Sequence, residues 1–287
     1  MQRSAVDELK RRALSGSAGP TLLRLRNWAA LRSIPFRNPE SAAAIANDIL
    51  CDKLIGRLCA PGGTFLDVGA HIGSVVARVK SGAPGAKVIA VEADPRKAAD
   101  LAARHPDVRV LSAAASDRTG RARFHVPTGA TGYASLHETG RNGESFEVDL
   151  HPLDDLVPTD AVDVVKLDVE GAELAALRGA ARLIARARPT VMFESVGASA
   201  GSRTAGLWCV FDSFGYDVFT PDRLAHDAPP LTLEAFLDAH AYPRRTHNYF
   251  AVARERRIEL RDKARCILRI SVSGPAPAAA AAPPLER

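Results

Sequence analysis

Asp67, Glu92 and Asp168 each lie at the end of a short apolar segment, where a buried strand would finish. The carboxyl ends of parallel strands line one crevice of a doubly wound sheet, so we expect the three carboxylates to face a common ligand. Three negative charges would repel a pyrophosphate. The pattern therefore favours a neutral or cationic nucleoside at this edge.

A glycine turn follows the first of these segments. Phe65–Val68 reads as a buried strand, and Gly69 and Gly73 permit a tight turn with close approach of a ligand to the backbone. A helix from Ser74 would point its free N–H groups at that ligand. The Gly-x-x-x-Gly spacing is not the Gly-x-Gly-x-x-Gly of dinucleotide binders, and alone it also fits an ordinary strand-to-helix turn.

Glu92, at the end of the second strand, is placed to accept both hydroxyls of a ribose. With the acidic edge, this points to an adenosine-type cofactor that carries positive charge, as S-adenosylmethionine does. Structural alternatives stay open for each carboxylate: a turn for Asp67, helix-dipole complementation for Glu92 and a helix cap for Asp168.

Alternating strand and helix patterns place these residues in an α/β fold with a parallel sheet. The alternation breaks at residues 112–150, where two period-2 runs predict an inserted β-hairpin with a flexible tip at 127–143. The predicted strands are residues 65–68, 88–91, 108–111, 162–167, 190–194, 216–219 and 249–253. One helix is predicted to follow Asp168, with Leu174, Leu177, Ala181 and Ile184 on its apolar face.

The predicted organisation has four parts. A helical extension covers residues 1–60, an α/β domain covers 61–253 with the insertion at about 112–150, a basic helix covers 254–273, and a disordered Pro/Ala-rich tail covers 274–287.

Composition limits the classes of function. The 287 residues carry a net charge of +5, but the excess of Lys and Arg lies at the two ends and the body is slightly acidic, which argues against a nucleic-acid groove. Four cysteines show no metal-ligand spacing, and no secretory signal or membrane span is evident. We expect a cytoplasmic protein without a nucleic-acid partner, and its amphipathic ends could support a homo-oligomer.

Four segments of the chain resemble the FkbM family of S-adenosylmethionine-dependent methyltransferases. They are Phe-Leu-Asp-Val-Gly-Ala-His-Ile-Gly at 65–73, Val-Glu-Ala-Asp-Pro at 91–95, Ala-Ala-Ser-Asp-Arg-Thr-Gly at 114–120 and Val-Lys-Leu-Asp-Val-Glu-Gly-Ala-Glu at 165–173. The resemblance covers about residues 50–253. It implies a Rossmann-like class I methyltransferase fold, a doubly wound and mostly parallel seven-stranded sheet whose last strand is antiparallel. It also implies O-methylation of a hydroxyl on a small molecule, sugar or natural product.

The resemblance also assigns site residues. The cofactor-binding set is Asp67, Gly69, Ala70, His71, Gly73, Glu92, Ala93, Ala115, Ser116, Asp117 and Asp168. Asp67, Gly69 and His71 would border the methionine part, Glu92 the ribose, and Ala115 to Asp117 the adenine.

Methyl transfer to an alcohol needs alignment and a general base. Asp168 is the first candidate for the base, followed by Glu170 and His247. Glu194, Tyr133 and Asn248 are expected on the acceptor side. Asp168, Glu170 and Glu194 could share a divalent cation, but their spacing does not require one and we expect no metal.

Two other functions remain open at the level of sequence. A nicotinamide-dependent oxidoreductase would need the third glycine of the dinucleotide turn, which is absent, since position 74 is Ser and position 75 is Val. A non-catalytic module could keep the fold and bind the cofactor without turnover. A nucleic-acid methyltransferase is disfavoured, because Asp168-Val169-Glu170-Gly171 stands where base methylation usually shows an Asn/Asp-Pro-Pro-aromatic segment.

Overall fold

The structure, a computed structural model, describes residues 39–128, 134–136, 142–157, 161–196 and 201–270, together with Thr21. Several predictions from sequence lie outside these residues. They concern the helices before residue 39, most of the 127–143 tip including Tyr133, and the 274–287 tail.

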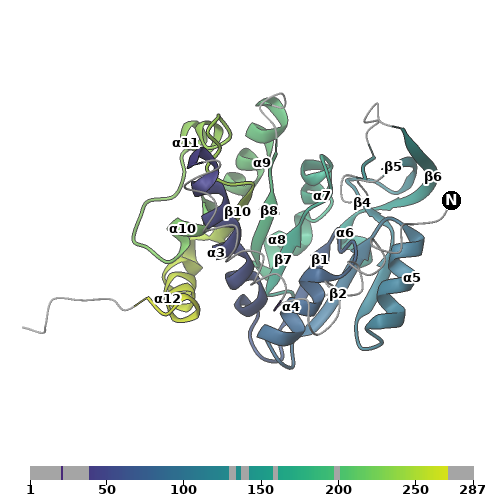
Figure 1. Cartoon of the computed structure of the whole chain (residues 1–287), viewed down its shortest axis with the longest axis horizontal. Helices are drawn as coiled ribbons and strands as arrows, with labels where there is room; N and C mark the ends of the chain where they lie inside the picture. Colours follow the sequence, from purple (N-terminus) through teal and green to yellow (C-terminus); the bar gives the residue numbers. More distant parts are fainter. Residues whose placement is uncertain are drawn as a thin grey trace, which may run out of the picture.

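The large sheet has the predicted seven strands in the order β3-β2-β1-β7-β8-β10-β9 (Figure 1). Neighbouring strands from β3 to β8 pair parallel, whereas β10 pairs antiparallel with both β8 and β9. The predicted doubly wound, mostly parallel sheet is confirmed. Its strands are β1 (Thr64–Val68), β2 (Lys87–Glu92), β3 (Arg109–Ser112), β7 (Val164–Leu167), β8 (Thr190–Glu194), β9 (Tyr216–Phe219) and β10 (Asn248–Ala253).

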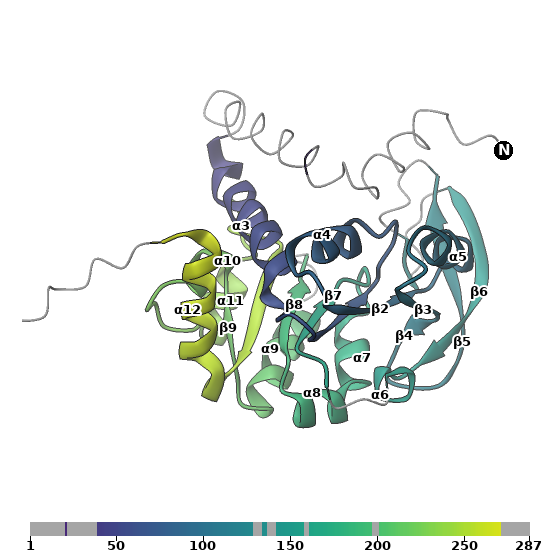
Figure 2. The ribbon, with the colours of Figure 1, turned by 90° about the horizontal axis from the view of Figure 1, so that it is seen from below.

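Helices cover both faces of this sheet (Figure 2). One face packs on α3 (Ala42–Leu58), α4 (Ser74–Gly82), α5 (Pro95–Arg104), α10 (Pro221–Leu224) and α12 (Arg257–Leu268). The other packs on α6 (Leu153–Leu156), α7 (Glu173–Arg178), α8 (Ala181–Ala187), α9 (Gly201–Ser213) and α11 (Leu233–Asp238). Short 3-10 turns at Pro39–Ser41 and Arg254–Arg256 precede α3 and α12.

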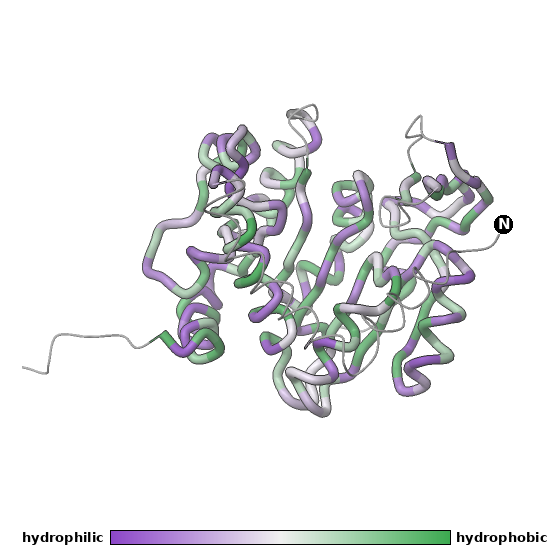
Figure 3. The backbone as a smooth tube through the Cα atoms, viewed as in Figure 1, coloured by the Kyte–Doolittle hydropathy of each residue, from purple (hydrophilic) through white to green (hydrophobic). Residues whose placement is uncertain are grey.

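The strands supply both cores because successive side chains point to opposite faces. Phe65 packs in the core beneath α3 and α4, whereas Leu66 and Val68 pack in the core beneath α7 to α9. Burying each such side chain contributes about 1.5–3 kcal/mol. The hydropathy trace shows the apolar residues gathered along these central strands (Figure 3). The two cores hold the strand ends rigidly for any site above them.

The insertion forms a second, three-stranded sheet in the order β4-β6-β5. β5 (Gly120–Pro127) pairs antiparallel with β6 (Gly143–His151), as the period-2 runs predicted, and β4 (Ala114–Ala115) pairs parallel with β6. The rings of Phe124 and Phe146 lie 5.8 Å apart and help to close its small core. An isolated antiparallel bridge between His125 and Ser135 attaches this part of the tip to β5.

The helix predicted after Asp168 is divided into α7 and α8. The division falls at Gly179, whose carbonyl accepts a hydrogen bond from Asp154 N at 2.9 Å. A Cβ at Gly179 would stand 1.9 Å from Ser116 O, so the chain approaches the insertion too closely for any other residue. None of the helices in the described ranges has the length and apolar character needed to cross a membrane.

Candidate functional site

A cavity of about 460 Å³ lies at the carboxyl ends of the central strands. Its wall includes eight of the residues predicted from sequence: Gly69, Ala70, His71, Glu92, Ala93, Asp168, Glu170 and Asn248. The size falls within the range of small-molecule sites.

The turn after β1 forms the floor of the cavity. Gly69 N and Ala70 N both donate to Val91 O, at 2.9 and 3.1 Å, so the turn is held against β2. Gly69 has φ +80°, and a Cβ there would stand 1.8 Å from Asp168 O. Glycine is therefore required, because the ends of β1 and β7 come together at this point. Gly73, also with positive φ, precedes α4 and does not line the cavity.

Glu92 is fixed in the cavity wall. Its Oε2 accepts from His71 N at 2.7 Å and its Oε1 accepts from Asp94 N at 2.9 Å. Each carboxylate oxygen has a second lone pair, so Glu92 can still accept from a ligand. Burial raises the pKa of this carboxyl, although Lys97 and the two backbone N–H groups oppose the shift.

Part of the cavity lining is apolar, and we call it the apolar slot. It is lined by Val91, Ala113, Ala114, Phe124 and Ala134, which come from β2, the segment after β3 and the small sheet. Such a slot suits a flat aromatic base. The residues predicted for the adenine, Ala115, Ser116 and Asp117, follow directly but do not line the cavity, and their contact with an adenine stays a prediction.

Lys166 links the carboxyl ends of β1 and β7 through its side-chain ammonium. Its Nζ donates to Gly69 O at 2.7 Å and lies 3.4 Å from Asp67 Oδ1 and 3.2 Å from Asp168 Oδ2. The contact follows from the register, in which Asp67 and Lys166 are partners on adjacent strands. Asp67 is fully buried and does not line the cavity, so the structure directs its carboxylate to Lys166 and not into the cavity.

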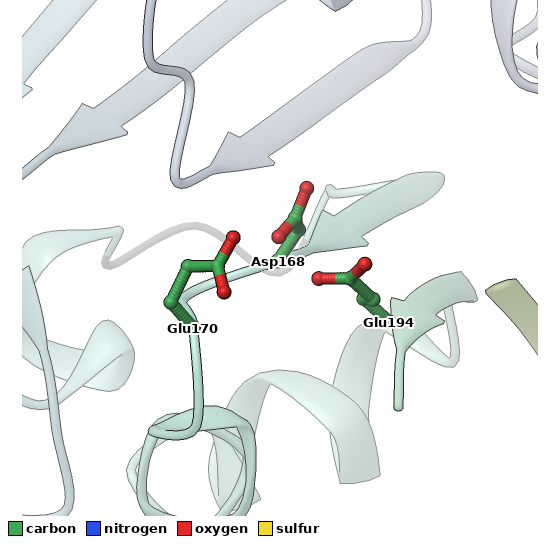
Figure 4. A group of neighbouring side chains, drawn as sticks. All are labelled: Asp168, Glu170 and Glu194. Atoms are coloured by element: carbon green, nitrogen blue, oxygen red, sulfur yellow. The ribbon is translucent and has the colours of Figure 1, made fainter. Parts of the chain in front are cut away.

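Three carboxylates converge at the ends of β7 and β8 (Figure 4). One oxygen from each of Asp168, Glu170 and Glu194 lies within 4.8 Å of the others. Burial raises the pKa of Glu194 to about 9, and the neighbouring Asp168 adds to the shift. For Asp168, burial is outweighed by Lys166 and by a hydrogen bond from Glu194, so its pKa lies below the usual value. Protonated Glu194 thus donates to ionised Asp168.

Glu170 is the member of this cluster whose pKa lies closest to neutral pH. Burial, with the charges of Asp168 and Glu173, raises its pKa to about 7. Its backbone is left-handed, with φ 45°, and its carbonyl accepts from Ser135 Oγ at 2.8 Å. Glu173 Oε1 accepts from Gly171 N at 3.0 Å, which fixes the other side of the loop. The strained conformation is therefore held from both sides.

Of the remaining predicted residues, some line the cavity and others do not. Asn248 lines the cavity, pairs with Glu194 in the sheet and donates from Nδ2 to Asp48 Oδ1 at 3.1 Å. His247 does not line it, and its carbonyl accepts from Ser195 N. His71 lines the cavity with φ 49°. Tyr133 lies outside the described residues.

Sequence reasoning overlooked the wall formed by α3 and α4. Asp48, Cys51, Asp52 and Ile55 from α3 and Arg78 from α4 all line the cavity. Asp48, Asp52 and Ile55 recur at helical spacing, which was the available signal. Nothing in the sequence indicated that this helix faces the strand ends.

Comparison with known proteins identifies a family. The model of the methyltransferase FkbM domain matches residues 67–218, which contain the glycine turn, Glu92 and the carboxylate cluster. No curated protein matches the chain.

Solved structures give weaker likenesses. The methyltransferase FkbM from Methylobacillus flagellatus is 19% identical with a TM-score of 0.42, over 79% of this chain and 59% of that one. The chain thus spans less than two thirds of that relative. Fibrillarin from Aeropyrum pernix, solved with S-adenosyl-L-methionine, is 15% identical with a TM-score of 0.39, over 71% of this chain and 74% of that one. Family membership therefore depends on the match over residues 67–218.

Proposed function

The chain belongs to the FkbM methyltransferase family, and we propose that it transfers the methyl group of S-adenosylmethionine to a hydroxyl oxygen of a small molecule. The observation that supports O-methylation most directly is the carboxylate cluster, in which Glu170 has a pKa near 7 beside the cofactor turn. A base with such a pKa is suited to take a proton from an alcohol at neutral pH.

The cavity fits the cofactor on its own features. Glu92 offers a fixed carboxylate for two ribose hydroxyls, and the apolar slot beside it suits the adenine. The acidic wall suits a sulfonium. When bound, S-adenosylmethionine supplies an electrophilic methyl group that needs no further activation.

The residues of the chain then divide the remaining work. Glu170 accepts the proton of the acceptor hydroxyl, while ionised Asp168 offers a hydrogen-bonding position that orients the acceptor. Protonated Glu194 does not line the cavity, and its hydrogen bond holds the Asp168 carboxylate in place. Lys166 keeps Asp168 ionised and holds the Gly69 carbonyl, so the cofactor turn and the carboxylates keep a fixed relation. We therefore propose Glu170 as the base in place of Asp168, the first choice from sequence, because the lowered pKa of Asp168 makes it the weaker proton acceptor.

Of the alternatives, the nicotinamide-dependent oxidoreductase is set aside by the family match. A non-catalytic module remains the competitor to be tested. It would bind the cofactor product without methylating any acceptor.

A labelled-methyl screen tests the proposal. The full chain is incubated with methyl-labelled S-adenosylmethionine and a panel of sugars, phenols and aliphatic alcohols, with matched amines and thiols. We expect label on an oxygen, and expect Asp168→Asn to bind S-adenosylhomocysteine normally while turning over more slowly. Label on nitrogen or sulfur alone would refute O-methylation, and tight product binding without transfer to any acceptor would support the non-catalytic module.

A further inference from the structure

An ion pair stands in the cavity wall between α3 and α4. Arg78 Nη1 lies 2.8 Å from Asp52 Oδ1, and the two side chains are 16% and 32% exposed. Both residues line the cavity. They come from helices that lie side by side in both views (Figures 1 and 2).

This wall is chemically distinct from the others. Glu92 and the apolar slot belong to β2 and the small sheet, and the carboxylate cluster belongs to β7 and β8. The wall formed by α3 and α4 brings a guanidinium and carboxylates together. Such a mixed surface matches a ligand group that carries both charges on neighbouring atoms.

Among the lysines and arginines of the described cavity lining, Arg78 is the one best placed to bind an anionic group. Among the described lining residues, Lys97 acts on Glu92 at the nucleoside end. Lys166 directs its Nζ to Gly69 O and two aspartates. A guanidinium has five N–H donors in a planar fork, and the Asp52 contact engages Nη1, so further donors remain for a carboxylate.

Asp48 and Asp52 complete the pattern. They are four residues apart on α3 and therefore share a face of the helix. Both line the cavity, Asp52 in contact with Arg78 and Asp48 accepting from Asn248 through one oxygen, so an ammonium next to a bound carboxylate would meet negative charge. A carboxylate and an ammonium on one carbon are the mark of an α-amino acid.

We propose that Arg78 binds the α-carboxylate of the methionyl end of S-adenosylmethionine, with Asp52 and Asp48 facing its α-ammonium. This proposal depends on the proposed use of the cavity by that cofactor. The sulfonium has three substituents. With the nucleoside at Glu92 and the methyl group toward the carboxylate cluster, the wall of α3 and α4 is left for the amino-acid end.

A purely structural ion pair that ties α3 to α4 is the competing explanation. The experiment therefore compares two ligands that share the nucleoside. S-adenosylhomocysteine carries the amino-acid end, whereas 5′-methylthioadenosine lacks it. Titration calorimetry on the full chain measures both affinities for the wild type and for Arg78→Met. Methionine keeps the aliphatic packing, since Arg78 Cγ lies close against Gly56. The matched control is Arg57→Met, an exposed arginine on α3 that does not line the cavity.

We expect Arg78→Met to weaken S-adenosylhomocysteine about tenfold or more, the usual effect of losing a charge-assisted hydrogen bond. Its affinity for 5′-methylthioadenosine should change less than about twofold, and Arg57→Met should alter neither. If Arg78→Met does not fold, Arg78→Lys serves instead and should show a smaller loss for S-adenosylhomocysteine alone. An equal loss for both ligands, or no loss, would overturn the proposal. A wild type that binds neither ligand would overturn the use of the cavity by S-adenosylmethionine itself.

Discussion

Lys166→Met tests whether one buried cation holds the site together. The Lys166 side chain is 5% exposed, and its ammonium lies between the side chains of Asp67 and Asp168, which are 0% and 34% exposed. Removing one partner of a buried ion pair costs about 3–5 kcal/mol, because the other charge is left without compensation. For a protein of this size, such a loss corresponds to a fall in Tm of about 5–10 °C.

The loss should depend on pH in a defined direction. In the wild type, the depressed pKa of Asp168 gives stability that is present above its unfolded pKa of about 3.9 and is lost as pH falls through the folded value. Without Lys166, the folded pKa values of Asp67 and Asp168 should both lie above their unfolded values. The carboxylates then destabilise the folded state at neutral pH, and the deficit should shrink as they take up protons at lower pH.

Urea denaturation at pH 8 and pH 5.5 measures this difference. Lys80→Met is the control, because Lys80 and Asp107 form a more exposed pair that should contribute little at either pH. Adding Asp67→Asn and Asp168→Asn to Lys166→Met should recover most of the lost stability, since no uncompensated charge remains. A deficit that is equal at both pH values, or no larger than that of Lys80→Met, would refute the reasoning.

Three further predictions concern the cavity. Gly69→Ala should weaken S-adenosylhomocysteine binding at least tenfold by calorimetry, because the added Cβ would collide with Asp168 O. Gly62 has a similar φ with open space around it, so the control Gly62→Ala should leave the affinity unchanged. Equal effects of the two substitutions would contradict the role of the turn. The rate of methyl transfer should rise with pH through about 7 as Glu170 loses its proton, and Glu170→Gln should lose that step in a pH–rate profile; an unchanged step would exclude Glu170 as the base. Chelation by EDTA should leave the rate unaltered, since the proton of Glu194 is already shared with Asp168; activity that vanishes with EDTA and returns with Mg²⁺ would reveal a cation in the cluster.

The sheet could be predicted well from sequence because its signals are local. The parallel strands are identified by apolar runs that end in Asp67, Glu92 and Asp168 and are followed by turn residues. No tertiary contact has to be known to recognise them. The division between α7 and α8 was less accessible. It depends on the approach of Gly179 to Ser116, a contact between segments far apart in the chain.

The site was predictable in outline but not in its side-chain directions. Asp67 and Glu92 look equivalent in sequence. Glu92 lines the cavity, whereas the Asp67 side chain is buried outside the cavity lining and forms an ion pair with Lys166. That difference depends on strand register, which places Asp67 opposite Lys166. The wall of α3 and α4 was missed for a similar reason, since nothing local tells which helix covers the strand ends.

The most direct test of the central claim is a calorimetric titration of S-adenosylhomocysteine into the wild type and Glu92→Ala. Since Glu92 is expected to accept the ribose hydroxyls, we predict binding to the wild type and a loss of affinity of about tenfold or more in the folded variant. Equal affinity in the two proteins, or no binding to the wild type, would contradict the assignment of the cavity to the cofactor.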